Sequence, residues 1–132
     1  MPEDPAISAR HVFVYGTLRR GDDNDITRLR PEPRWVGPAR IKGVMYHFGR
    51  YPGVALGGAD DVVGEVYEIS PALEAVLDEI EEVYPQQTNE YAKRVIGVDV
   101  QGRRVECIVY EINPDRLGGR ARIASGDWVK DR

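Results

Sequence analysis

The sequence has few of the residues that form disulfides and metal sites. Among 132 residues it has one cysteine, Cys107, and two histidines, His11 and His47. A single cysteine excludes an internal disulfide, and no Cys pair or His-Glu-x-x-His pattern provides the spacing of a zinc site. Cys107 lies in an apolar run, which favours a small buried residue over a nucleophile. We therefore expect no metal site and no cofactor.

Long apolar runs are also missing. No stretch approaches the roughly 20 apolar residues that a membrane-spanning helix needs. The first residues lack the basic and apolar regions of a signal peptide. We therefore expect a flexible N-terminal tail over residues 1–10, a cytoplasmic location and no membrane partner.

Positive charge is in deficit, with a formal net charge of -4. Nucleic-acid binding usually needs a concentrated positive field, so we expect no nucleic-acid partner. Four arginines do gather in one stretch, for which a solvated basic loop is the favoured interpretation. They are Arg28, Arg30, Arg34 and Arg40.

The apolar pattern indicates one folded domain over residues 11–132. Hydrophobic residues make up 42% and charged residues 30%, as in ordinary globular proteins. A chain of this length suits a single domain with an adequate core. Alternating apolar residues predict five strands, the last two joined in a hairpin by Gln101-Gly102. The predicted strands cover residues 11–15, 41–48, 62–69, 93–100 and 105–112.

One helix interrupts these strands. Ser70 can cap it and Pro71 suits its first position, and it runs to about Glu82, before Pro85. Residues 19–40 form a long loop, with a short helical turn near residues 26–29, that serves as a lid, as an interface or as neither. Strands outnumber helices without regular alternation, which predicts an α+β fold with a curved or barrel-like sheet.

The predicted helix carries five acids: Glu74, Asp78, Glu79, Glu81 and Glu82. Its buried stripe consists of Leu73, Val76, Leu77 and Ile80. At about 100° per residue, Asp78, Glu79 and Glu82 point away from this stripe.

Two of these acids, Glu81 and Glu74, lie at the border of the stripe, and Glu81 is nearer to it. Partial burial raises the pKa of a carboxylate, which suits a proton acceptor near neutral pH. Spacing alone leaves both residues as candidates, and glutamates that simply cover a helix flank are common.

A glycine turn follows the first predicted strand. Gly16 in Tyr15-Gly16-Thr17-Leu18 permits a close approach of the backbone to a ligand, or a positive φ. Consecutive N–H groups leaving a sheet can bind an anion or a developing oxyanion. The spacing fits neither a P-loop nor a dinucleotide fingerprint. An ordinary strand-to-loop turn remains the alternative.

Six segments together resemble the γ-glutamyl cyclotransferase-like superfamily, which includes γ-glutamylamine cyclotransferases and AIG2-like plant proteins. Each is weak alone, but their order and their span over residues 11–128 are specific. They are Val12–Gly21, Tyr51-Pro52-Gly53, Val63–Tyr67, Leu77-Asp78-x-x-Glu81, Tyr91 and Ser125–Trp128. The resemblance implies a small mixed β-barrel with one or two packed helices.

The resemblance also implies a reaction that needs no metal or cofactor. The α-amine of a γ-glutamyl group attacks its own γ-carbonyl, giving 5-oxoproline and a free amine or amino acid. Glu81 matches the catalytic general acid and base. The partner is then a small γ-glutamyl compound, and the chain a monomer or homodimer. The implied substrate-binding residues are Tyr15, Gly16, Thr17, Leu18, Tyr51, Gly53 and Tyr91.

Two positions depart from the family pattern. Glu82 stands where the family usually has glycine, and the helical wheel points it outward, so we expect it to be tolerated. Lys93 stands where the family often has arginine, which bears on substrate choice more than on the fold because the two cations bind differently.

Two other functions remain open. One is a non-catalytic small-molecule-binding or interaction module of the same fold. The other is a different reaction in the same pocket, such as removal of a γ-glutamyl protecting group from a biosynthetic intermediate. Glu81 favours the enzymatic interpretations, since a binding module needs no proton acceptor.

Overall fold

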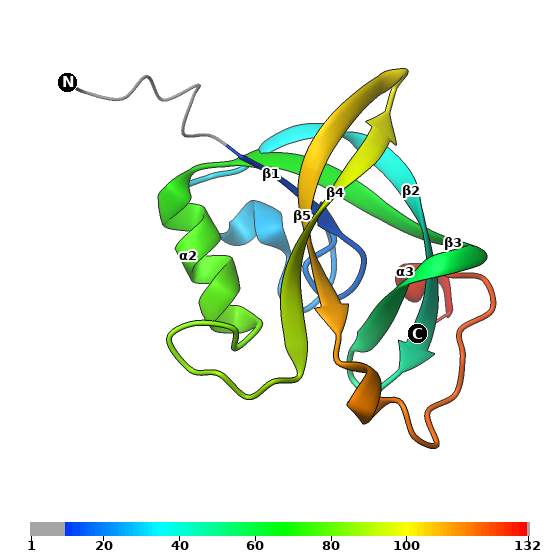
Figure 1. The fold of residues 1–132 in the computed structure, drawn as a ribbon. Helices are drawn as coiled ribbons and strands as arrows, with labels where there is room; N and C mark the ends of the chain where they lie inside the picture. Colours follow the sequence, from blue (N-terminus) through cyan, green and yellow to red (C-terminus); the bar gives the residue numbers. More distant parts are fainter. Residues whose placement is uncertain (1–9, 132) are drawn as a thin grey trace.

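A computed structural model describes residues 10–131 (Figure 1). The predicted tail over residues 1–9 lies outside this range, and Arg10 already belongs to the first strand. The strands are β1 (Arg10–Val14), β2 (Arg34–His47), β3 (Pro52–Ile69), β4 (Tyr91–Val100) and β5 (Arg103–Ile112). The helical segments are η1 (Ile26–Arg28), α2 (Pro71–Ile80), η2 (Pro114–Arg116) and α3 (Trp128–Asp131).

The strands form one sheet in the order β2-β3-β1-β5-β4. All neighbours are antiparallel except β1 and β5, which run parallel with His11 opposite Cys107. The predicted hairpin is confirmed: Gln101 and Gly102 both have positive φ, 49° and 81°, as a tight hairpin turn requires. Cys107 is fully buried, and burial raises the pKa of its thiol.

The predicted α+β fold is confirmed, but the sheet is not closed into a barrel. Its edges approach each other where a Cβ on Gly37 would lie 3.0 Å from Val100 Cγ1. Within residues 10–131, however, no hydrogen-bonded ladder joins β2 to β4. The result is a strongly curved, open sheet, with α2 and η1 packed at one side (Figure 1).

Strands β2 and β3 form a longer hairpin than expected. They begin at Arg34 and Pro52 rather than near residues 41 and 62. Register shifts interrupt their pairing near Gly37 and Gly43. Arginines, prolines and glycines in these stretches hid the strands, because bulges admit residues that a regular strand disfavours.

Strand β1 is buried on both faces. Val12 and Val14 pack with Leu73 and Leu77 of α2, while Phe13 packs into a second core on the opposite face of the sheet. Side chains alternate between faces along a strand, so β1 links both cores. Residues 15–18 directly follow the C-terminal end of β1, so they begin between the two cores.

Helix α2 begins as predicted and ends two residues early. Ser70 Oγ accepts a hydrogen bond from the Leu73 N–H at 3.1 Å, and Leu73 and Leu77 are fully buried. The helix ends at Ile80. Glu81 is its C-cap residue, and its N–H donates to the Leu77 carbonyl at 2.9 Å.

Candidate active site

A cavity of about 610 Å³ lies where the end of β1 meets the end of α2 and the start of β4. Glu81 and residues 15–18 line it together, as do Tyr51 and Tyr91. The structure thus brings into one cavity a loop and a carboxylate that are more than sixty positions apart. Their chemical roles remain predictions.

The loop over residues 15–18 uses its carbonyls and leaves N–H groups available. The carbonyls of Gly16, Thr17 and Leu18 accept hydrogen bonds from residues 19, 24 and 26, each at 2.9 Å. The N–H groups of these three residues donate to no backbone or side-chain group within residues 10–131. A row of such donors suits a carboxylate or an oxyanion.

Gly16 is required by packing. Its φ is not positive, so the left-handed alternative does not apply. A Cβ at this position would lie 2.7 Å from Pro52 Cγ, which no real side chain tolerates. The glycine therefore lets the loop lie directly against the start of β3.

A partly buried ion-pair network fixes the far end of this loop. Arg19 bonds to Glu65 at 3.0 Å and to Asp127 at 2.8 Å. Glu65 also accepts the Arg20 N–H at 3.0 Å and the Tyr67 hydroxyl at 2.9 Å. Hydrogen bonds to charged groups are the strong ones. The sequence matched the segments that hold Glu65 and Asp127 but assigned these residues no role.

Glu81 is partly buried and has no ion-pair partner within residues 10–131. Burial raises its pKa to about 7, and the negative charges of Glu90 and Glu82 add to this shift. Both protonation states are therefore populated near neutral pH. That is the property a group needs to accept a proton and return it.

Two tyrosines form walls of the cavity with their hydroxyls already engaged. Tyr15 Oη donates to the Tyr110 carbonyl at 2.6 Å, and Tyr91 Oη donates to the Pro52 carbonyl at 2.8 Å. Burial raises the pKa of Tyr15 and of Tyr91 well above the usual value. Both therefore stay neutral and present mainly aromatic surface.

Among the other predicted binding residues, Tyr51 lines the cavity and Gly53 does not. Tyr51 Oη donates to Glu90 Oε2 at 3.0 Å, and Glu90 itself lines the cavity. Gly53 is buried beneath the site, where a Cβ would lie 2.8 Å from Ile112 Cγ1. Glu90 was not among the residues predicted from the sequence, although it directly precedes the matched Tyr91.

The other acids of α2 have different surroundings. Lys93 Nζ bonds to Glu74 and, at 2.9 Å, to Asp78. Glu74 also accepts from Arg10 at 3.2 Å, and Asp78 accepts the Tyr110 hydroxyl at 2.8 Å. The expected outward orientation of Asp78 is therefore wrong, because Tyr110 and Lys93 hold it against the sheet. Glu74, the second candidate at the border of the apolar stripe, forms ion pairs with Arg10 and Lys93.

Glu82 is exposed, as the helical wheel predicted, but it does not lie on the helix. The wheel assumed a helix through residue 82, but α2 ends at Ile80 and Glu82 has a φ of 56°. The turned backbone places Glu82 on the lining of the cavity. A glycine commonly occupies such a left-handed position after a helix.

The sequence and the fold are similar to those of known proteins. Residues 12–130 match the family model described as gamma-glutamyl cyclotransferase, AIG2-like. The chain belongs to this family. The match covers both the loop at residues 15–18 and Glu81, and it agrees with the resemblance found in the sequence.

Three relatives illustrate the similarity. YkqA of Bacillus subtilis, provisionally named a gamma-glutamylcyclotransferase, is 30% identical over 120 residues, 89% of this chain and 40% of YkqA. Its crystal structure superposes with a TM-score of 0.72 over 92% of this chain and 40% of the YkqA chain. An AIG2-like protein of Mus musculus gives a TM-score of 0.68 at 27% identity, covering 83% of each chain.

The third relative has a specific name. The gamma-L-glutamyl-butirosin B gamma-glutamyl cyclotransferase of Niallia circulans is 31% identical over 124 residues, 92% of this chain and 72% of that protein. This chain thus spans well under half of YkqA but most of the Niallia protein.

Two kinds of feature are absent from residues 10–131. No group of three or more His, Cys, Asp or Glu side chains is arranged to hold a metal ion. None of the helices in this range has the length and apolar character needed to cross a membrane.

Proposed function

We propose that this protein converts a γ-glutamyl amine or amino acid to 5-oxoproline and the free amine, with Glu81 as general base and then general acid. The observation that carries the proposal is the position of Glu81. Its carboxylate, with a pKa raised to about 7, lines the same cavity as the available N–H groups of residues 16–18. A module that only binds ligands needs no such carboxylate.

The reaction begins with a proton transfer from the substrate's α-ammonium to the Glu81 carboxylate. The freed amine attacks the γ-carbonyl carbon, a C–N bond forms and the carbonyl electrons move to oxygen. Ring closure is intramolecular, so the protein need supply little proximity. Its main contribution is the correct protonation state of Glu81 at neutral pH.

The second step breaks the original amide bond. The oxyanion returns its electrons to carbon, and the leaving nitrogen takes the proton from Glu81 as the C–N bond breaks. The ring nitrogen then gives its second proton to the regenerated Glu81 carboxylate, which passes it to the released amine, so that neutral 5-oxoproline and an ammonium product remain. The N–H groups of Gly16, Thr17 and Leu18 are suited to stabilise the oxyanion or to hold the substrate carboxylate. The ion pairs of Arg19 support this role by fixing the loop.

The test is the formation of 5-oxoproline from γ-glutamyl amino acids, γ-glutamyl-ε-lysine and glutathione. Glu81→Gln keeps the shape of the side chain and removes the base, so kcat should fall by about 1,000-fold. Glu79→Gln is the matched control: Glu79 is exposed on the same helix and does not line the cavity. It should leave the rate near that of the wild type.

Glu74→Gln tests the alternative assignment. If this variant loses all activity while Glu81→Gln keeps the wild-type rate, the general base has been misassigned. If no γ-glutamyl compound is converted by the wild-type protein, a binding module becomes the better interpretation. The Niallia relative, named for a γ-glutamyl derivative of butirosin B, makes larger γ-glutamyl amides worth including in the panel.

A further inference from the structure

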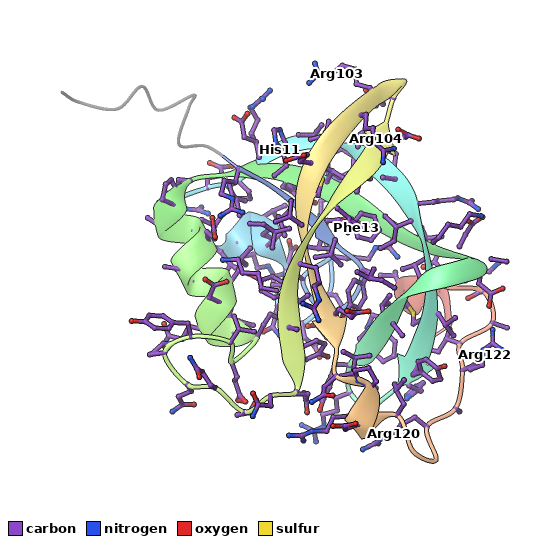
Figure 2. All side chains as sticks on the ribbon, viewed as in Figure 1. His11, Phe13, Arg103, Arg104, Arg120 and Arg122 are labelled. Atoms are coloured by element: carbon purple, nitrogen blue, oxygen red, sulfur yellow. The ribbon has the colours of Figure 1, made fainter. Side chains whose placement is uncertain are left out.

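A smaller cavity lies near the start of β1, away from the cavity that contains Glu81. Its volume is about 220 Å³, and its polar lining consists of His11, Arg34, Gln101 and Arg103. No acidic side chain lines it among residues 10–131. Figure 2 shows His11 and Arg103 at the same end of the sheet, near the start of β1 and at the tip of the β4–β5 hairpin. This Arg34–Arg103 cavity therefore presents two cations and no anion, in a chain with a net charge of -4.

The Arg34–Arg103 cavity lies where the open sheet comes closest to closing. Arg34 begins β2, one edge strand, and Val100 ends β4, the other edge strand. Gln101 follows in the hairpin turn, and a Cβ on Gly37 of β2 would lie 3.2 Å from its amide nitrogen. Arg103 begins β5 just beyond this turn. Like charges on the two sides of the gap repel each other, and an anion held between them removes that repulsion.

Both arginines have N–H groups available for such an anion. Arg103 belongs to no ion pair in the part of the chain that the structure describes. Arg34 donates to Glu68 through Nε at 3.0 Å and through Nη2 at 2.9 Å. These bonds use two of the five N–H donors of a guanidinium, and Glu68 does not line the cavity.

Both arginines also act on His11. Burial is the main cause that lowers the pKa of His11, and the charges of Arg34 and Arg103 lower it further, while Glu68 opposes them. The two guanidinium groups are therefore close enough to the same imidazole ring to influence it. With a lowered pKa the ring is mostly neutral at pH 7, so it can donate one hydrogen bond to a ligand.

A larger cavity adjoins this one. Its volume is about 400 Å³, and His11, Arg103 and Val105 line both cavities. Val95 and Ile108 contribute apolar surface to it, and Val95 is 52% exposed. Its other lining residues are two cations and one acid: Arg10, Arg104 and Glu106. An organic group attached to an anion in the smaller cavity therefore has apolar surface beside it.

We propose that the Arg34–Arg103 cavity binds the phosphate group of a small molecule, held by arginines from the two sides of the gap in the sheet. The planar guanidinium group matches phosphate oxygens with paired N–H donors. Phosphate offers more oxygens and more charge than a carboxylate, which suits donors that come from three separate strands and a turn. The Arg34–Arg103 cavity shares no lining residue with the cavity of Glu81, so the proposal is independent of the cyclotransferase function.

The experiment adds inorganic phosphate to the isotope-labelled protein at pH 7 and low salt, and follows the two histidine rings by NMR. His47 ends β2, at the other end of that strand from Arg34, and serves as the internal control. The His11 signals should move and reach saturation while the His47 signals stay in place. Added NaCl should weaken the binding. If the His11 signals do not move, or if both rings respond equally, the proposal is wrong.

Three variants assign the binding to residues. Arg103→Gln removes a cation that has no ion pair to lose, and it should raise the Kd for phosphate by about tenfold. Glu68→Gln releases Arg34 and should lower the Kd by about threefold. Arg122→Gln is the matched control, because Arg122 is exposed and lies far from the hairpin tip (Figure 2). An unchanged Kd in Arg103→Gln, or an equal loss in Arg122→Gln, would overturn the proposal.

AMP and adenosine identify the source of the phosphate group. Tighter binding of AMP than of inorganic phosphate would support a phosphate ester whose organic part occupies the larger cavity. Tighter binding of inorganic phosphate would support the free ion as the ligand. Adenosine lacks the phosphate group and should leave the His11 signals in place. Adenosine that binds as tightly as AMP would overturn the proposal, because the phosphate group would then contribute nothing.

Discussion

Helix α2 carries acidic residues within its length and others just past its end, and the two groups have opposite surroundings. Within the helix, Glu74 and Asp78 share the ammonium group of Lys93. Just past its end, Glu81 and Glu82 have no cation partner among residues 10–131, and their charges repel. The first group stabilises the contact between helix and sheet. The second is unfavourable for folding, and it faces the cavity.

This contrast shows why counting acids does not locate a site. A carboxylate with a cation beside it is a structural group, whereas an unpaired, partly buried carboxylate has a raised pKa and is available for chemistry. The two groups differ in their neighbours on β4 and β5, which the helix sequence alone does not contain. Mutations that remove or restore partners should therefore affect the two groups of acids in opposite ways.

The largest expected change in stability comes from Glu81→Gln. Because the pKa of Glu81 is raised to about 7 in the folded protein, the folded state keeps a proton that the unfolded state loses above about pH 4.5. Wild-type stability therefore falls between about pH 4.5 and 7, and this loss is complete above pH 7. The variant should be more stable by about 2 to 3 kcal/mol at pH 8 and equally stable at pH 4.

Urea unfolding of both proteins at several pH values measures this difference. Glu79→Gln serves as the control and should track the wild type throughout. A Glu81→Gln variant that is less stable than the wild type at pH 8 would show that the ionised carboxylate has an undetected stabilising partner.

Lys93→Met tests the paired acids. It leaves Asp78 and Glu74 partly buried with their shared cation removed, so the free energy of unfolding should fall by about 1 to 2 kcal/mol. A double-mutant cycle with Asp78→Asn isolates the pair. If the effects of the two single variants simply add, the pair at 2.9 Å contributes nothing to stability.

Much of the fold could be predicted because local patterns agree with the final structure. Ser70 and Pro71 mark the helix start, and Gln101-Gly102 marks the hairpin, through preferences of the residues themselves. The first halves of β2 and β3 could not be predicted, because bulges near Gly37 and Gly43 break the alternation. Whether the sheet closes into a barrel depends on pairing between strands far apart in the sequence, which no local pattern predicts.

The residues of the candidate site also fall into a group that could be predicted from the sequence and a group that could not. Gly16 and Glu81 were identified because a turn and a helix border are local features, and family motifs supported both. Glu90 and the Arg19–Glu65 pair could not be found, because their roles depend on contacts between distant elements. The exposure of Glu82 was predicted, but its place at the cavity was not, because the helical wheel continued past the end of α2.

Glu82→Gly should sharpen the contrast at the unpaired end. Glycine accepts the φ of 56° without strain, and the change removes a negative charge from the helix C-terminus. The gain is partly offset by the greater freedom of glycine in the unfolded chain. We expect a net stabilisation of about 1 kcal/mol, measured by urea unfolding.

Glu82→Ala separates the two causes of that gain. Alanine removes the charge but keeps the strained backbone, so it should gain less than glycine does. Equal gains for the two variants would attribute the whole effect to charge and none to the left-handed conformation.

The smallest expected effect concerns the pH dependence of catalysis. If Glu81 must be ionised to accept the proton, kcat/KM should rise with pH through an acid limb near pH 7, the pKa of the free enzyme's base. Glu90→Gln removes a negative charge that disfavours ionisation of Glu81, so the acid limb of kcat/KM should move to lower pH by about half a unit.

Tyr51→Phe is the control for this prediction, because it deletes the hydrogen bond between Tyr51 and Glu90 at 3.0 Å but retains the charge of Glu90. An acid limb that stays in place in Glu90→Gln, or that moves equally in Tyr51→Phe, would mean that Glu90 acts through structure. A shift confined to Glu90→Gln would show that the unpaired glutamates control the proton affinity of the catalytic base.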